Sequence, residues 1–213
     1  SWPPPGTRSV RLYLRSGAQL STARAGVGEG SEALFDTGLS TESFALSVMG
    51  QPAGEAGVLW YVSNPLRRDL RVSGRALLDL RVATDQTSTH FTPVLFDLGP
   101  PVSTTRSLCT FVPPQEACVM SRGFLNARYR NGLGHGEDVV PGQRYVAPIE
   151  FIDNDWVVQA GHRIAVAVMS SNLWWALPDQ QRASTTVFHD ARNPSALVLP
   201  IVGGPAAART AGL

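Results

Sequence analysis

The sequence contains no lysine, so all 18 of its basic residues are arginine. Charged residues of both signs make up only 16% of the 213-residue chain, and 17 acidic residues leave a net charge of +1. A nucleic-acid-binding surface needs clustered excess positive charge, so we expect no nucleic-acid partner. The chain also lacks any apolar run near the roughly 18 residues that a membrane-spanning helix needs, so we expect no membrane partner. Its 43% of hydrophobic residues and low net charge instead favour a folded globular chain.

Helical periodicity is scarce, and the dominant pattern has a period of two. No stretch of eleven or more residues keeps an i, i+3, i+4, i+7 apolar stripe, and residues 41–49 would make only one or two helical turns. By contrast, Val10, Leu12 and Leu14 alternate with residues that include Arg11, which is the pattern of a strand with one buried face.

Further strands are expected along the whole chain, separated by turns rich in glycine and proline. The expected runs cover residues 57–63, 70–72, 78–82, 90–98, 118–129, 144–152, 163–169, 184–188 and 196–201. Eight to eleven strands joined by turns predict an all-β fold, most simply a jelly-roll β-sandwich of two packed sheets. We expect one domain over residues 1–203 and a flexible tail over residues 204–213.

The chain has only two cysteines, Cys109 and Cys118, which enclose eight residues including Pro113 and Pro114. Because no other cysteine competes, we expect them to form a disulfide, which would stabilise the fold by about 2–3 kcal/mol. A disulfide would imply an oxidising compartment. The alternative is two reduced cysteines near a hairpin, and the sequence leaves both open.

The motif of a serine-hydrolase nucleophile, Gly-x-Ser-x-Gly between a strand and a helix, is absent from the sequence. A triad assembled from scattered residues stays open, because triads are defined by geometry. However, His90, His162 and His189 lie at the ends of expected strands, and His135 lies in a glycine-rich loop. We interpret all four as structural and expect no catalytic residue in this chain.

Metal and cofactor motifs are incomplete. The cysteines have no histidines at zinc-site spacing. The run Asp153-Asn154-Asp155 lacks the glycine and distal glutamate of a calcium loop, so we interpret it as a turn. The Gly132-x-Gly134-x-Gly136 run is not followed by a helix that could bind a phosphate, so it indicates a loop. We therefore expect no metal and no cofactor.

Tryptophans suggest a binding surface. Trp174 and Trp175 follow an expected strand, and Trp2 precedes three prolines. Exposed tryptophan anchors many protein interfaces, so we take these three residues as interface candidates. Because neighbouring residues of an extended chain point oppositely, at most one of Trp174 and Trp175 is expected on a common surface. The alternative is a carbohydrate-binding module that stacks sugars on one of these rings.

Several segments together carry a family resemblance. They are residues 1–14 (SWPPPGTRSVRLYL), 59–85 (LWYVSNPLRRDLRVSGRALLDLRVATD), 91–100 (FTPVLFDLGP), 121–130 (SRGFLNARYR), 159–171 (QAGHRIAVAVMSS) and 193–204 (NPSALVLPIVGG). In this order they resemble the C-terminal domain of the Xaa-Pro dipeptidyl-peptidase family of serine hydrolases, which includes cocaine esterase and the α-amino-acid ester hydrolases. The likeness is closest to the actinobacterial branch. The family often has Phe-Pro and Arg-Asn after Ser171, where this chain has Asn172, Leu173 and the two tryptophans.

The resemblance implies a jelly roll similar to galactose-binding folds, packed beside an α/β-hydrolase domain and a helical cap. The parent enzyme would use a Ser-Asp-His triad to cleave X-Pro dipeptides, small esters or amides. None of the family's catalytic motifs matches a position here, so the chain is expected to be a non-catalytic piece of a larger hydrolase. Partners would be the hydrolase and cap domains, with a homo-oligomer of the parent as a further arrangement. The branch and the cysteines lead us to expect a secreted, extracellular protein.

Overall fold

A computed structural model describes residues 2–51, 57–100, 109–112, 115–179, 182–192 and 194–213. The strands are β1 Thr7–Arg15, β2 Gln19–Ser21, β3 Ser31–Phe35, β4 Val58–Val62, β5 Leu70–Gly74, β6 Leu77–Thr84, β7 His90–Phe91, β8 Val94–Gly99, β9 Cys109–Val112, β10 Gln115–Arg122, β11 Leu125–Asn126, β12 Tyr145–Glu150, β13 Asn154–Val158, β14 Arg163–Met169, β15 Ser184–Phe188 and β16 Ala196–Val202. Two α-helices, α1 Glu42–Ser47 and α2 Gly204–Ala211, and one 3-10 turn, Ala127–Tyr129, complete the described elements.

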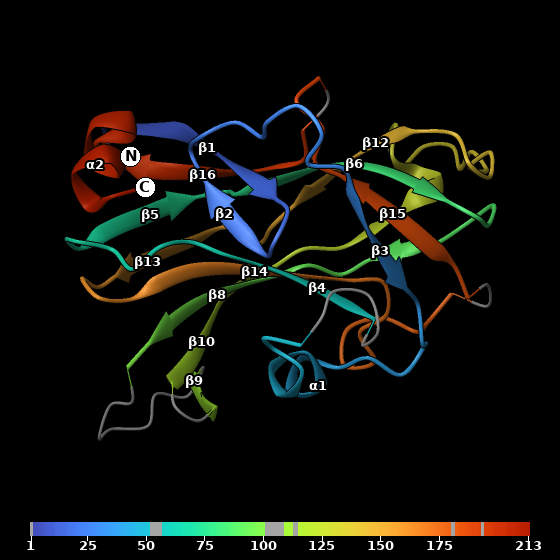
Figure 1. The fold of residues 1–213 in the computed structure, drawn as a ribbon, viewed down its shortest axis with the longest axis horizontal. Helices are drawn as coiled ribbons and strands as arrows, with labels where there is room; N and C mark the ends of the chain where they lie inside the picture. Colours follow the sequence, from blue (N-terminus) through green and yellow to red (C-terminus); the bar gives the residue numbers. More distant parts are fainter. Residues whose placement is uncertain (1, 52–56, 101–108, 113–114, 180–181, 193) are drawn as a thin grey trace.

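The strands form an all-β sandwich of two layers (Figure 1). In the first layer the strand order is β3, β15, β6, β16 and β1. Strand β12 also pairs with β6. Strand β5 pairs with β16, and β13 pairs with β5. The second layer has the order β4, β14, β8, β10 and β9, and the short strand β2 links β1 to β4. One apolar core fills the space between the layers. It includes Leu12 of β1, Leu80 of β6 and Leu199 of β16 from the first layer, with Tyr61 and Val166 from the second.

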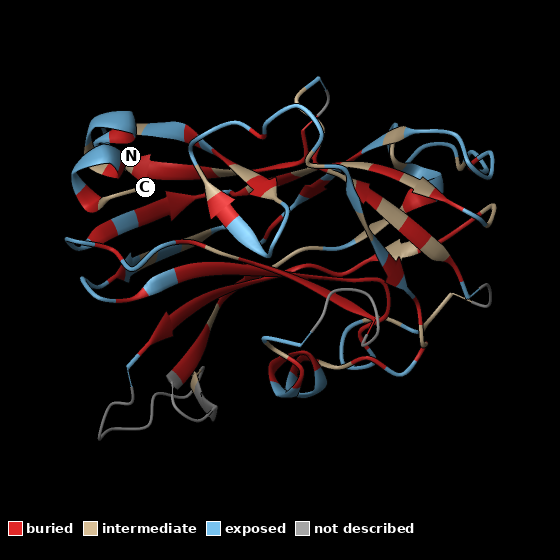
Figure 2. Ribbon diagram, in the orientation of Figure 1, coloured by how far each residue is buried: buried red, intermediate tan, exposed pale blue. Residues whose placement is uncertain are grey.

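The alternating pattern of β1 produces the burial that the sequence predicts, with Leu12 and Leu14 fully buried and Arg11 exposed. The second layer differs, because β14 is buried at every position from Ile164 to Met169 (Figure 2). A second apolar cluster explains this. The outward side chains of β4, β8 and β14, such as Trp60 and Phe96, pack against α1. Strands covered on both faces favour continuous apolar runs over alternation.

Helix α1 falls inside the stretch where the sequence suggests one or two helical turns. The Thr41 hydroxyl caps its first turn by accepting from the Phe44 N–H at 3.1 Å, and Trp60 Nε1 donates to the Ala45 carbonyl at 3.1 Å. The helix thereby fixes its first residue, Glu42, in a buried position.

The expected flexible tail over residues 204–213 is wrong, since α2 occupies most of it. Proline near its N-terminus and a run of alanines favour a helix, and Gly212, with a φ of 90°, ends it in the left-handed conformation. Ala208 and Ala211 are buried against β1, β16 and β5. Both chain ends therefore lie at the same end of the sandwich (Figure 1).

No helix among the described residues is long and apolar enough to cross a membrane.

Candidate functional site: an exposed aromatic surface

The loop after β14 presents both tryptophans to solvent. Asn172 is buried, and its carbonyl accepts from the N–H groups of Trp175 and Ala176 at 2.9 and 3.0 Å. This closes a turn instead of continuing an extended strand. As a result Trp174 and Trp175 are both exposed, at 63% and 51%, and of the two only Trp175 is among the residues that line the groove described below. The alternation rule does not apply to this turn, because it holds only for extended backbone.

A partly buried ion pair contacts one of these rings. Glu42, at the start of α1, accepts from Arg122 at the end of β10, with Nη2 to Oε2 at 2.7 Å, and from the Asn172 amide at 3.4 Å. The Arg122 guanidinium carbon lies 5.1 Å from the centre of the Trp175 ring, within the range of a cation–π contact. Three distant segments thus hold Trp175 in place.

Trp175 forms one wall of a groove of about 290 Å³, which we name the Trp175 groove. Its lining residues are Arg122, Gly123, Phe124, Glu150, Phe151, Ile152 and Trp175. Phe124 and Ile152 are 50% and 57% exposed, so the groove is largely apolar and open. A glycine is needed at position 123, because a Cβ there would come within 2.9 Å of Ile149 and 3.1 Å of the Glu150 carbonyl.

Trp2, the third interface candidate, lines a separate groove of about 400 Å³, which we name the Trp2 groove. The ring is 54% exposed, and Arg8, Arg75, Asp153 and Pro200 are among the other residues of the walls. The sequence could not identify Phe124, Ile152 or Arg122 as neighbours of Trp175, because they come from other segments of the chain.

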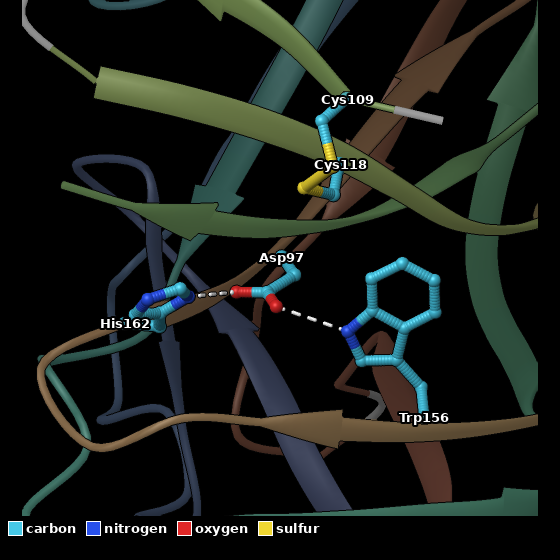
Figure 3. The surroundings of a disulfide bond; sticks show 5 residues. All are labelled: Asp97, Cys109, Cys118, Trp156 and His162. Atoms are coloured by element: carbon cyan, nitrogen blue, oxygen red, sulfur yellow. Dashed lines mark hydrogen bonds and ion pairs between the residues drawn. A yellow bond between two sulfur atoms is a disulfide. The ribbon is translucent and has the colours of Figure 1, made fainter. Parts of the chain in front are cut away.

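A buried acid joins the two layers near the disulfide (Figure 3). Asp97 of β8 is 1% exposed and its carboxylate accepts from Trp156 Nε1 at 2.9 Å and contacts His162 Nδ1 at 2.7 Å. Gly99 makes room for the His162 ring, which a Cβ at that position would overlap. Cys118 lies opposite Asp97 on β10 and forms a disulfide with Cys109, its neighbour on β9.

The His162–Asp97 pair, with Trp156, links β8 to β13 and to the segment before β14. Both cysteines are held in the disulfide, so neither offers a thiolate beside the histidine. Pro113 and Pro114, which the sequence places between the two cysteines, lie outside the described residues.

A second cluster brings together serine, aspartate and histidine, but in the wrong order for catalysis. Ser88 Oγ donates directly to Asp179 Oδ2 at 2.6 Å, and His90 Nε2 lies 3.7 Å from the same oxygen and 3.1 Å from the Asn126 amide. In a catalytic triad the histidine lies between the hydroxyl and the acid. Here the acid lies between the hydroxyl and the histidine, so the histidine does not accept the serine proton.

His189 is fully buried in a third network. Its Nε2 lies 3.1 Å from Glu32 Oε2, to which the Tyr61 hydroxyl also donates at 2.8 Å. Burial opposes the charge of Glu32, but the hydrogen bonds from His189 and Tyr61 outweigh it and hold the pKa of the carboxyl below its ordinary value. Burial also raises the pKa of Tyr61 well above its usual range. This network joins β3, β4 and the end of β15.

One group of three potential metal ligands occurs among the described residues, formed by Cys109, Glu116 and Cys118. Its two sulfurs belong to the disulfide, and metals bind thiolates. The carboxylates of Asp153 and Asp155 are occupied by Arg75 and Arg71, at 2.8 and 2.6 Å, and Asp155 lies within β13.

Comparison with known proteins identifies the family. Residues 1–198 match the family described as the X-Pro dipeptidyl-peptidase C-terminal non-catalytic domain. The chain is 28% identical to a putative Xaa-Pro dipeptidyl-peptidase of Streptomyces avermitilis, over 97% of this chain and 34% of the relative. It is 25% identical to the cocaine esterase of a Rhodococcus species, over 94% of this chain and 39% of the relative. The chain thus spans about a third of the length of these relatives.

Solved structures share the fold. An α-amino acid ester hydrolase matches 91% of this chain and 36% of its own with a TM-score of 0.74 at 21% identity. An aminopeptidase from a marine-sediment Thaumarchaeota archaeon matches 95% of this chain and 38% of its own with a TM-score of 0.75 at 19% identity. These findings favour the accessory-domain interpretation over the carbohydrate-binding alternative. The chain belongs to the X-Pro dipeptidyl-peptidase C-terminal domain family, as a non-catalytic β-sandwich domain.

Proposed function

We propose that this chain is the accessory domain of a serine hydrolase and packs on that enzyme's α/β-hydrolase domain. The parent would cleave X-Pro dipeptides from peptide N-termini, or small esters or amides. Support comes from the names of the relatives and from the two thirds of their length that the chain does not cover. The domain would stabilise the hydrolase domain and help shape access to its substrate site.

The observation that carries this proposal is the exposed aromatic surface around Trp175. The exposed Trp175 ring, which contacts the partly buried Arg122–Glu42 pair, is suited to contact another protein, because it can be buried with little loss of conformational freedom. The described histidine clusters serve as structural links. The disulfide supports the further proposal that the parent is exported to an oxidising compartment.

The test compares the full parent protein, the parent lacking residues 1–213, and this chain alone. Each is assayed with an Ala-Pro chromogenic amide and a simple aryl ester. We expect turnover by the parent and none by this chain. The shortened parent should lose activity on heating faster than the full parent. Loss of one buried tryptophan-sized anchor would raise the rate of inactivation by a factor of about 10 or more. Turnover by this chain alone would contradict the proposal. So would a shortened parent that keeps full activity and heat resistance.

A further inference from the structure

We propose that Cys109, Cys118 and Glu116 bind one zinc ion when the disulfide between the two cysteines is reduced. A newly made chain has reduced cysteines until it meets an oxidant, so the protein passes through this state before any export. The same two sulfurs would then hold β9 to β10 in both states, by a bond to each other when oxidised and through the metal when reduced.

The strand pairing brings the three ligand atoms together. Cys109 and Cys118 are directly opposite each other in the β9–β10 ladder, which contains four register pairs. Glu116 lies two residues before Cys118 on the same strand, so the two side chains point to the same face of the sheet. The two sulfurs and one carboxylate oxygen of Glu116 all lie within 4.8 Å of one another. The ladder therefore presents all three groups to one point in space.

Two thiolates and a carboxylate favour zinc. Zinc is bound by sulfur at about 2.3 Å and by carboxylate oxygen at about 2.0–2.2 Å in a tetrahedron, which puts its ligand atoms about 3.5–4 Å apart. Breaking the S–S bond and rotating the cysteine side chains about their Cα–Cβ bonds reaches this spacing. Calcium and magnesium prefer oxygen ligands, so they fit the site less well. With three protein ligands, a water molecule would complete the tetrahedron.

The burial of Glu116 independently points to a cation. The residue is only 8% exposed, and none of the described residues donates a hydrogen bond to its carboxylate or forms an ion pair with it. A buried carboxylate without a partner is costly, and coordination of a metal is one of the ways in which proteins offset that cost. In the oxidised state the adjacent sulfurs cannot help to hold such an ion, because metals bind thiolates.

The groups next to the site are acidic. Asp97 is the register partner of Cys118 on β8, so its carboxylate lies on the same face as the disulfide (Figure 3). That carboxylate contacts His162 at 2.7 Å, and in the described part of the chain no arginine pairs with Asp97 or Glu116. The surroundings therefore favour a cation over an anion. Because Asp97 already accepts from Trp156 and contacts His162, we assign it as a neighbour of the metal and not as a ligand.

Two balanced steps lead from the disulfide to the metal site. A dithiol reductant breaks the S–S bond, transfers two electrons and two protons to the cysteines, and itself becomes a disulfide. Zn²⁺ then replaces the two thiol protons, so binding releases about two protons per ion. Cys109 is partly exposed on β9, which lies at the end of the described strand order, so the reductant and the ion reach the sulfurs from solvent.

Titration of Zn²⁺ into the oxidised chain and into the reduced chain, freed of reductant under anaerobic conditions, tests the proposal. We expect the reduced chain to bind one ion and to release about two protons, measured by calorimetry in two buffers of different protonation enthalpy. Co²⁺ in place of Zn²⁺ should give thiolate-to-metal charge-transfer absorption. The oxidised chain should bind either ion at least about a hundredfold more weakly, because it has no thiolate.

A set of glutamate variants tests the third ligand. Glu116→Gln keeps the size of the side chain and both thiols, and should weaken Zn²⁺ binding by at least about tenfold. Glu116→His supplies another zinc ligand and should bind within about tenfold of the original. Glu137→Gln, in an exposed ion pair with Arg130, is the matched control and should leave the affinity unchanged. Tryptophan fluorescence of each oxidised variant, in which the disulfide holds β9, reports whether the substitution has disturbed the fold.

Three results would overturn the proposal. Equal binding by the oxidised and reduced chains would place the ion on exposed carboxylates or histidines. Equal binding by the reduced original and the reduced Glu116→Gln variant would leave an adventitious complex of the two thiolates only. A reduced chain that binds no Zn²⁺, whether folded or unfolded, would remove the site altogether. None of these results bears on the proposed function, because its test measures hydrolysis and heat inactivation of the parent.

Discussion

At the residue scale, Asp97 links β8 to two groups from other segments. Its carboxylate is almost fully buried and contacts both His162 and Trp156. Asparagine at this position removes the charge and replaces one of the two acceptor oxygens by an NH2 donor, so either His162 or Trp156 loses its acceptor, and an unpaired buried polar group is costly.

We expect Asp97→Asn to lower the free energy of unfolding by about 3 kcal/mol, measured by urea denaturation. Asp155→Asn is the control, since Asp155 lies on the same strand as Trp156 but forms an exposed ion pair with Arg71. Its effect should be much smaller. Equal losses for the two variants would show that the buried network does not stabilise the fold.

Glu29 gives a prediction about pH. It accepts from Arg15 Nε at 3.0 Å and from the Gly26 N–H at 2.8 Å, and the hydrogen bond from Arg15 is the main cause that lowers the pKa of its carboxyl to about 2. Because this pKa is lower in the folded state, the charged carboxylate stabilises the fold above about pH 4.5, and the stabilisation is lost as the pH falls towards 2.

We therefore expect Glu29→Gln to reduce the free energy of unfolding by about 1 kcal/mol at pH 7, a value typical of a partly exposed charged hydrogen bond. The difference between the variant and the original should shrink to near zero at about pH 2, in unfolding curves recorded across the pH range. A difference that stays constant from pH 7 to 2 would contradict this role for the carboxylate.

At the scale of elements, α2 closes one end of the sandwich. Ala208 and Ala211 are buried, and the Arg67 N–H donates to the Ala211 carbonyl at 2.8 Å. Deleting residues 204–213 exposes the apolar ends of β1, β5 and β16.

Deletion of this helix should lower the free energy of unfolding by about 2 kcal/mol or more, the value for burying one large apolar side chain. The matching thermal measurement should show a lower melting temperature. An unchanged melting temperature would fit the frayed tail that the sequence suggested.

The disulfide fixes β9 to β10 next to the buried Asp97 (Figure 3). Replacing both Cys109 and Cys118 by alanine should cost about 2–3 kcal/mol, since the closed loop is short. Denaturant unfolding of the double variant, with the reduced original as a second reference, measures this. Equal free energies of unfolding for the oxidised and the reduced protein would mean that the crosslink does not constrain the unfolded chain.

The strand pattern was predictable because apolar residues recur at every second position of a half-buried strand. The run at residues 184–188 coincides with β15, whose burial alternates. The run at 163–169 coincides with β14, which was predictable instead as a continuous apolar run. Helix α2 was not predicted, because eight residues give too few turns for an apolar stripe to stand out. Its signals were local: Pro205 near the start, alanines within and Gly212 after the end.

The site was only partly predictable. Trp2 stands before three prolines, and Trp174 and Trp175 follow an expected strand, so all three could be proposed from sequence. The walls of the grooves come from other segments, such as Pro200 of β16 in the Trp2 groove and Arg122 of β10 in the Trp175 groove, and no periodic pattern reports such proximity. The pairing of Arg122 with Glu42 likewise depends on how α1 packs on the second layer.

At the scale of the whole molecule, the sandwich contains its own core and an open aromatic face. Its polar clusters are arranged to join strands, as Asp97, Glu32 and Asp179 each show. These features agree with the description of the matching family as the non-catalytic C-terminal domain of X-Pro dipeptidyl-peptidases.

The central claim is that catalysis by the parent uses no serine of this chain. The direct measurement is labelling of the full parent protein with a serine-directed fluorophosphonate, followed by peptide mapping of the modified residue. We predict one labelled serine, located outside residues 1–213, and no label on this chain when it is treated alone. Labelling of any serine of this chain at the same rate as the parent loses hydrolase activity would contradict this claim.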